Sequence, residues 1–286
     1  MDRRRSRHGR GGHLDPARRR GPGADLRRRR PRPRARGVSA GAGSGPAAPG
    51  WLADTPLAHR GLHGDGVPEN SLPAFAAARD AGYGVELDVW VTRDRVPVVA
   101  HDPSLAAITG EGRRIADLTL AEVRARPLLG SDERVPTLTA ALDVLGTTPT
   151  MVEVKSRRLT AGRAEADVAA ALDVHRGPLC VASFNPATVR WFRRHRPDVT
   201  RVLTSGPPAG FAPLPAPVRT RLAELRDLPG VAPAAVSYDH HGLPSAATDR
   251  WRERGGLLVT WTVADAATLD RVRDQADNVI FEHLRP

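Results

Sequence analysis

Short apolar runs alternate with amphipathic segments from Trp51 to the end of the 286-residue chain. This alternation is typical of repeated βα units around a parallel sheet. We predict helices at 71–82, 119–126, 137–145, 161–175, 186–196, 244–254 and 266–274, and the proline-rich region 206–233 receives no assignment. The predicted strands are 56–59, 84–91, 96–100, 150–155, 179–184, 200–204, 234–238, 257–263 and 278–282.

The number of strands and the position of their polar residues favour a barrel. An α/β chain of this length fits a TIM-type (β/α)8 barrel, with residues 96–100 forming a small accessory insertion after the second strand. A doubly wound open sheet fits the alternation nearly as well. However, polar side chains follow several different strands, and a barrel assembles its site from such separate strand ends. We therefore predict the barrel.

The positive charge of the chain is concentrated at its start. Residues 1–37 contain 15 arginines and three aspartates, whereas the whole chain has a formal net charge of +11. The remaining residues are thus close to neutral, and the high pI is not evidence that the folded part binds nucleic acid. We expect residues 1–50 to be a disordered arginine-rich tail and a Gly/Ala/Pro linker, and residues 51–286 to be the barrel domain.

The expected partners and location also follow from composition. No aromatic residues interleave the arginines of the tail, so we expect no specific nucleic-acid partner and at most weak contact with anionic polymers or lipid surfaces. No apolar stretch near the start has the length of a signal peptide or membrane span. The single cysteine, Cys180, cannot form an intrachain disulfide, and we expect a cytoplasmic protein.

Two predicted strands carry ionisable side chains inside apolar runs. In "GVELDVWVTRD", Glu86 and Asp88 are two residues apart and therefore point to the same face of the strand. In "MVEVKS", Glu153 and Lys155 repeat this spacing. Three carboxylates suit a hard divalent cation, Mg²⁺ or Ca²⁺, and the lack of a His/Cys cluster makes zinc less suitable. Lys155 is the only lysine of the chain, which indicates a position that needs a compact ammonium group.

Two histidines end apolar runs in the same way. His59 follows "PLA" and His101 follows "PVVA". In-line displacement at phosphorus needs a base or nucleophile on one side and an acid on the other, and histidines can fill both roles near neutral pH. The neighbouring Arg60 suits a phosphate oxygen. The pattern predicts phosphodiester chemistry.

The block "AHRG…PENSLPAF…AGYGVELDVWVTRDRVPVVAHDPSL" resembles the signature of the glycerophosphodiester phosphodiesterases. The segments "VPTLTAAL", "VEVK", "ASFNP" and "VTWTV" follow in the order of that family, so the resemblance covers residues 56–282. It implies the same barrel, a role in lipid metabolism, and metal-dependent hydrolysis of a glycerophosphodiester to glycerol 3-phosphate and an alcohol.

The resemblance also implies roles for ten residues. These roles are catalysis by His59 and His101, metal ligation by Glu86, Asp88 and Glu153, phosphate contact by Arg60 and Lys155, contact with the glycerol by Trp261, and support of the loop beneath the site by Glu69 and Asn70.

The sequence departs from the family pattern in two places, and three other functions stay open. Ala107 stands where an arginine is usual, and Phe281 and Glu282 replace a Thr-Asp or Thr-Asn pair. We expect these changes to affect specificity for the alcohol and closure of the barrel rather than the chemistry. One alternative is transfer within lysophospholipids to give a cyclic phosphate, as in the related phospholipase D toxins of spider venom. The others are a non-catalytic barrel that binds phosphodiesters and a nucleic-acid-binding protein that acts through the tail.

Overall fold

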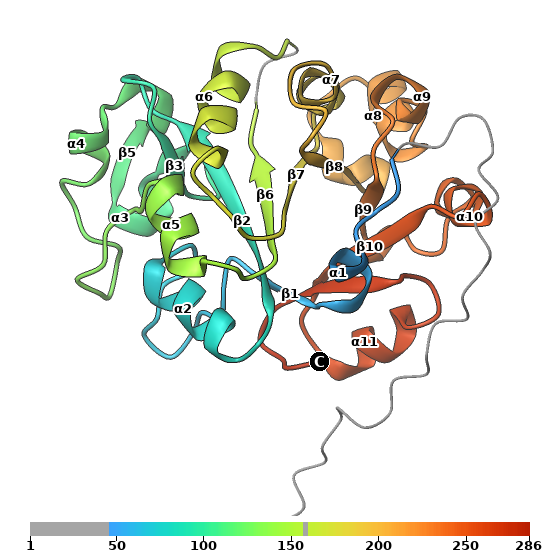
Figure 1. The fold of residues 1–286 in the computed structure, drawn as a ribbon, viewed down its shortest axis with the longest axis horizontal. Coiled ribbons are helices and arrows are strands. Elements are labelled where there is room, and N and C mark those ends of the chain that lie inside the picture. The colour runs from blue at the N-terminus through green and yellow to red at the C-terminus, as the bar shows by residue number, and fades with distance from the viewer. Residues whose placement is uncertain (1–45, 157–159) are drawn as a thin grey trace, which may run out of the picture. The chain divides into compact units, whose positions relative to one another are not determined.

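A closed barrel of eight parallel strands forms the centre of the molecule in the computed structural model, which describes residues 46–156 and 160–286 (Figure 1). The strand β1 (Leu57–His59) pairs with β2 (Gly84–Val91) on one side and with β11 (Asn278–Phe281) on the other, which closes the ring. The prediction of a barrel is confirmed and the open sheet is excluded. The barrel strands are β1 (Leu57–His59), β2 (Gly84–Val91), β6 (Thr150–Val154), β7 (Leu179–Ser183), β8 (Thr200–Ser205), β9 (Ala235–Asp239), β10 (Leu257–Val263) and β11 (Asn278–Phe281).

Helices surround the barrel and connect successive strands (Figure 1). The first connecting helix, α2 (Leu72–Asp80), begins after Ser71, whose hydroxyl accepts a hydrogen bond from the backbone N–H of Ala74. The short helix α1 (Gly50–Asp54) precedes β1 and buries Leu52 completely. The other helices outside the insertion are α2 (Leu72–Asp80), α5 (Leu138–Leu145), α6 (Arg163–Leu172), α7 (Pro186–His195), α8 (Ala216–Ala223), α9 (Leu228–Val231), α10 (Ala246–Glu253) and α11 (Ala266–Val272).

A small insertion follows β2, as the sequence predicts. The strand β3 (Pro97–Val99) pairs antiparallel with β2. A hairpin of β4 (Ser104–Leu105) and β5 (Glu111–Arg114) follows, with α3 (Ala106–Thr109) between its strands. The 3₁₀ helix η2 (Ile115–Asp117) and α4 (Leu120–Val123) complete the insertion, which has an apolar cluster of its own.

The alternation of side chains divides the strands into two faces. Along β6, Val152 and Val154 pack towards the surrounding helices, whereas Met151 packs with side chains from other barrel strands. The neighbouring β7 contributes the buried Cys180 to the same interior cluster. The apolar layer thus lies at the amino-terminal half of the strands, and the polar residues follow it at the carboxyl-terminal half.

Some predicted elements have different bounds. The helix predicted at 119–126 is only α4, and the one predicted at 161–175 is the shorter α6. The unassigned region contains η3 (Pro208–Phe211), α8 and α9, and a proline is the second residue of both α-helices, in the first turn, where it is tolerated. The 3₁₀ helix η4 (His240–Gly242) follows β9.

Two further expectations from the sequence concern the start of the chain and membrane-spanning segments. Of the predicted tail and linker, residues 1–45 lie outside the described residues. In the described part of the chain, every helix is too short or too polar to cross a lipid bilayer.

Candidate active site

Three carboxylates meet inside the carboxyl-terminal end of the barrel. The alternation along β2 turns Glu86 and Asp88 inward, because Leu87 between them packs with the outer apolar cluster. The pairing of β2 with β6 places Glu153 directly beside Asp88. All three side chains are buried, and each offers an oxygen within 4.8 Å of the others.

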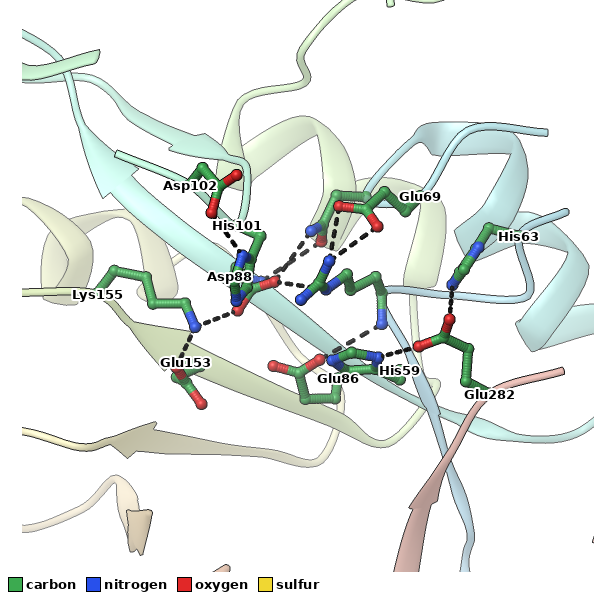
Figure 2. Close-up of polar contacts among 12 residues, drawn as sticks. His59, His63, Glu69, Glu86, Asp88, His101, Asp102, Glu153, Lys155 and Glu282 are labelled. Atoms are coloured by element: carbon green, nitrogen blue, oxygen red, sulfur yellow. Dashed lines mark hydrogen bonds and ion pairs between the residues drawn. The ribbon is translucent and has the colours of Figure 1, made fainter. Parts of the chain in front are cut away.

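The three carboxylates, shown with their polar neighbours in Figure 2, differ in how readily they ionise. Burial, together with the charges of Asp88 and Glu153, raises the pKa of Glu86 well above its usual value. Burial also opposes ionisation of Asp88, but Lys155, His101 and Arg60 outweigh it and lower the pKa of Asp88 to about 2. The cluster therefore contains at least one firmly ionised carboxylate and one that resists ionisation.

The ammonium of Lys155 lies between two of the carboxylates. Its Nζ is 2.8 Å from Oδ1 of Asp88 and also contacts Glu153. Burial disfavours its charge, but the charges of Glu153 and Asp88 prevail and raise the pKa of Lys155. The compact cation expected from the sequence is thus in contact with the acidic cluster.

The donor set fits a divalent cation. It consists of oxygens alone, which Mg²⁺ and Ca²⁺ prefer. Burial and the charges of Asp88 and Glu153 together raise the pKa of Glu86, and a bound positive ion would offset both effects. A second group of possible ligands is Asp239, His240 and His241. There, Nδ1 of His240 accepts a hydrogen bond from Arg271 (2.7 Å), so its Nε2 carries the proton and is not free to bind a metal.

Two histidines flank the cluster, and a carboxylate holds each of them. His59 lies beside Glu86 in the register of β1 and β2, and its Nδ1 is 2.6 Å from Oε2 of Glu282. His101 lies near Asp88, and its Nδ1 is 2.9 Å from Oδ1 of Asp102. An ionised carboxylate only accepts hydrogen bonds, so in both rings Nδ1 is the donor. In the neutral ring, Nε2 is then the basic nitrogen.

The turn after β1 positions Arg60 and depends on Gly61. Gly61 has a φ of +82°, and a Cβ at this position would lie 2.8 Å from backbone atoms of Ala74. Only glycine therefore allows α2 to pack this closely. The Arg60 guanidinium donates hydrogen bonds to both oxygens of Glu69 (2.9 and 2.8 Å), and its Nε is 3.4 Å from Asp88.

The two residues expected to support the loop contact the site directly. Glu69 pairs with Arg60, as described above, and Asn70 donates a hydrogen bond from Nδ2 to Oδ2 of Asp88 (3.0 Å). Each thus joins the loop before α2 to a charged residue of the site.

An aromatic-walled cavity of about 280 Å³ adjoins the carboxylates. Its lining includes Glu153 and Lys155, with Trp90 and Phe184 as its aromatic walls. The indole N–H of Trp90 donates a hydrogen bond to the backbone carbonyl of His101 (2.9 Å). Trp261 does not belong to this lining but packs edge-on against Phe184, with ring centroids 5.5 Å apart.

Glu282, which directly follows β11, makes a contact in the site that the sequence does not predict. Glu282 was expected to affect barrel closure and specificity, yet the barrel closes and Glu282 contacts His59 (Figure 2). Sequence reasoning also missed Asp102, which follows His101 directly. The position of each carboxylate in the sequence was the available signal. Asp102 directly follows His101, and Glu282 directly follows the last barrel strand. The other departure, Ala107, is exposed in α3 of the insertion.

The model of the glycerophosphoryl diester phosphodiesterase family matches residues 59–283 of this chain. The chain belongs to this family. The match begins at His59 and includes Glu282, so it contains every residue of the site described above.

Among curated members of this family, glycerophosphodiester phosphodiesterase 1 of Rattus norvegicus is 42% identical to the chain over 95 residues, which are 30% of the chain and 28% of the rat protein. The chain thus matches little more than a quarter of that relative. Lysophospholipase D GDPD1 of Homo sapiens is 32% identical over 112 residues, covering 35% of each protein.

Solved structures share the fold. A phosphodiesterase of Oleispira antarctica, in complex with the product sn-glycerol-3-phosphate, superposes with a TM-score of 0.69 at 23% identity, over 80% of this chain and 94% of that one. A putative glycerophosphoryl diester phosphodiesterase of Silicibacter pomeroyi gives a TM-score of 0.66 at 24% identity, over 79% and 88%. At these identities the likeness is one of fold.

Proposed function

We propose that this protein hydrolyses glycerophosphodiesters to sn-glycerol 3-phosphate and an alcohol, with a divalent cation, Mg²⁺ or Ca²⁺, held by Glu86, Asp88 and Glu153. The observation that carries the proposal is the pair of histidines beside an all-oxygen cluster, each fixed at Nδ1 by a carboxylate. Family membership and the product bound to the Oleispira antarctica relative support the choice of substrate class.

The histidines have different surroundings, which suggests different roles. The side chain of His59 is 16% exposed and that of His101 is 39% exposed. In the proposed reaction, Nε2 of His59 accepts a proton from the attacking water as the new P–O bond forms. Protonated His101 gives its Nε2 proton to the departing alcohol oxygen as the old P–O bond breaks. The more exposed His101 then regains a proton from solvent, and His59 loses its proton to solvent.

Cations surround the position proposed for the phosphate. Lys155 and Arg60 both touch Asp88, so both lie at the edge of the metal cluster, where they can approach phosphate oxygens. When bound, the metal ion would supply further positive charge to the phosphoryl oxygens. Glu69 and Asn70 orient Arg60 and Asp88 through the hydrogen bonds described above.

The test is release of sn-glycerol 3-phosphate from glycerophosphocholine and glycerophosphoethanolamine by metal-stripped protein, before and after addition of Mg²⁺ or Ca²⁺. His59→Ala should abolish release. The matched control is His195→Ala, a histidine at the end of α7, which should leave release unchanged. Metal-independent release, or release retained in His59→Ala, would refute the proposed mechanism.

Lysophospholipids should be tested as a second class of substrate, because the chain is similar to a protein named lysophospholipase D. Phosphorus NMR of the products would separate hydrolysis from intramolecular transfer. A persistent cyclic phosphate would favour transfer. Binding of the diesters by folded protein without turnover would favour the non-catalytic barrel.

A further inference from the structure

The carboxylate of Glu282 contacts three imidazole rings. Its Oε2 is 2.6 Å from Nδ1 of His59. Its Oε1 is 2.7 Å from Nε2 of His283 and 3.8 Å from Nε2 of His63. Figure 2 shows Glu282 between His63 and His59.

The closure of the barrel creates the contact between Glu282 and His59. Ala58 of β1 is in register with Phe281 of β11. His59 follows Ala58 as the last residue of β1, and Glu282 follows Phe281 directly after the end of β11. The two parallel strands therefore place these side chains at the same end of the barrel. The contact spans 223 positions of sequence.

The second oxygen of Glu282 is also held in place. His283 contacts it at hydrogen-bond distance, and the rings of His63 and His283 pack edge to face with centroids 5.6 Å apart. The side chain of Glu282 is 23% exposed, whereas that of Asp102, which holds the other histidine, is 54% exposed. Glu282 is therefore the more sheltered and more firmly fixed of the two carboxylates.

The charge state of Glu282 determines which ring nitrogen of neutral His59 carries the proton. The hydrogen bond from His59 outweighs the effect of burial and lowers the pKa of Glu282 to about 2, so the group is a carboxylate near neutral pH. A carboxylate only accepts hydrogen bonds, and the hydrogen bond at one ring nitrogen fixes the tautomer. Its contact at Nδ1 therefore leaves Nε2 of neutral His59 as the proton acceptor.

We infer that Glu282 is a positioning residue, which holds His59 in the Nδ1–H tautomer with Nε2 available for the reaction. The inference deepens the proposed function and, as far as it concerns catalysis, rests on it. Neither Glu282 nor its partners His63 and His283 belong to the metal cluster. Loss of the Glu282 carboxylate should therefore impair proton transfer without removing the metal ligands.

The first test does not depend on activity. Nitrogen-15 NMR of the histidine rings reports which ring nitrogen carries the proton, and His59→Ala identifies the signal of His59. We expect the Nδ1–H form in the metal-free wild type and its loss in Glu282→Ala. The control Glu224→Gln removes the charge of a surface carboxylate paired with Arg226, and it should leave the signal unchanged. A wild-type signal in the Nε2–H form, or an unchanged signal in Glu282→Ala, would overturn the inference.

The second test is kinetic. Glu282→Ala should lower kcat by about 100-fold, the lower end of the contribution of a positioned general base, with KM and the affinity for Mn²⁺ close to wild type. Added formate, a small carboxylate that can enter the space left by the side chain, should restore part of kcat in Glu282→Ala but not in His59→Ala. A fall of less than threefold, or a fall that formate does not reverse while Mn²⁺ affinity is lost, would contradict a positioning role.

The two tests separate the inference from the proposed function. If the wild type hydrolyses none of the diesters, the proposed function fails, and the NMR arm still decides whether Glu282 fixes the tautomer. If the wild type is active and the NMR signal does not respond, only the inference on Glu282 fails.

Discussion

Asp88 and Glu153 lie directly opposite each other in the register of β2 and β6, and the ammonium of Lys155 contacts both carboxylates. The only lysine of the chain thus neutralises part of a cluster that also fits a metal ion. The Lys155 ammonium and a bound metal ion would share these oxygens. The first prediction distinguishes the contributions of the two cations.

Lys155→Met should lower activity by about 100-fold or more, because it removes the electrostatic contact with the phosphate that we propose for Lys155. It should also destabilise the metal-free protein by about 3–5 kcal/mol, since two buried carboxylates lose their cation. Metal affinity should stay equal or rise, because a competing charge is removed. Calorimetric titration with Mg²⁺ and Ca²⁺ and urea unfolding measure these effects. Loss of metal binding in Lys155→Met, with Lys155→Arg as the charge-conserving comparison, would contradict the prediction.

Glu86→Gln should stabilise the metal-free protein at pH 8. The folded state raises the pKa of Glu86, so folding favours its protonated form and stability falls as the pH rises above the unfolded value of about 4.3. Glutamine removes this penalty. The advantage of the variant over wild type should shrink as the pH approaches 4. Urea unfolding in the presence of a chelator measures the difference in stability between the two proteins. A wild type more stable than the variant at pH 8 would refute the argument.

The same variant should fail to respond to metal. Mg²⁺ or Ca²⁺ should raise the melting temperature of the wild type, since ligands that bind only the folded state stabilise it. We expect Glu86→Gln to show a much smaller rise and a parallel loss of activity. Full metal stabilisation of the variant would remove Glu86 from the proposed ligands.

Glu282 should make the protein sensitive to acid. Its pKa in the folded protein is about 2, below the unfolded value of about 4.3. A lowered pKa contributes stability above the unfolded value, and this contribution disappears as the pH falls from about 4.3 to about 2. Wild type should therefore lose more stability than Glu282→Gln over this window. Urea unfolding at pH 6, 4 and 3 tests it, and parallel losses would show that the carboxylate has no such effect.

Trp90→Phe removes the hydrogen bond from the indole to the backbone carbonyl of His101. The cost should be about 1 kcal/mol of stability, the usual contribution of one hydrogen bond. The variant also changes one wall of the cavity beside Lys155, so KM should change more than for surface variants. Thermal unfolding and initial rates with two different diesters measure both effects. Unchanged KM for every diester would indicate that this cavity does not bind substrate.

Gly61→Ala should destabilise the protein by at least about 2 kcal/mol, because the added Cβ meets the backbone of Ala74 and the φ of +82° is unfavourable for alanine. Gly112→Ala is the matched control, since a Cβ there meets no atom within 4 Å. Urea unfolding of both variants decides. Equal effects would mean that α2 can move away from the turn at little cost.

The inward-facing carboxylates could be predicted from the sequence because they depend on local spacing. A two-residue interval on an apolar strand is enough to place Glu86 and Asp88 on one face. The histidines at strand ends follow from the same reasoning together with barrel architecture.

The contact of Glu282 with His59 could not be predicted in this way. It arises only when β11 docks against β1, and the register of that pairing is a tertiary property. The hydrogen bond from Trp90 to His101 also could not be predicted, because it requires β3 to turn back and pair antiparallel with β2. The helices in 206–233 were not predicted because the region is rich in proline, which usually indicates a break in a helix. Here the prolines lie in the first turn of each helix, where they are tolerated.

The closure of β1 against β11 has a consequence for protein synthesis. A ribosome makes His59 early and Glu282 more than two hundred residues later, yet the barrel brings them into contact. The strands β2 and β6, which carry the three carboxylates, are both synthesised before β11, the second neighbour of β1. Its histidine acquires its partner only when the last strand emerges, so the site remains incomplete until the barrel is nearly fully translated.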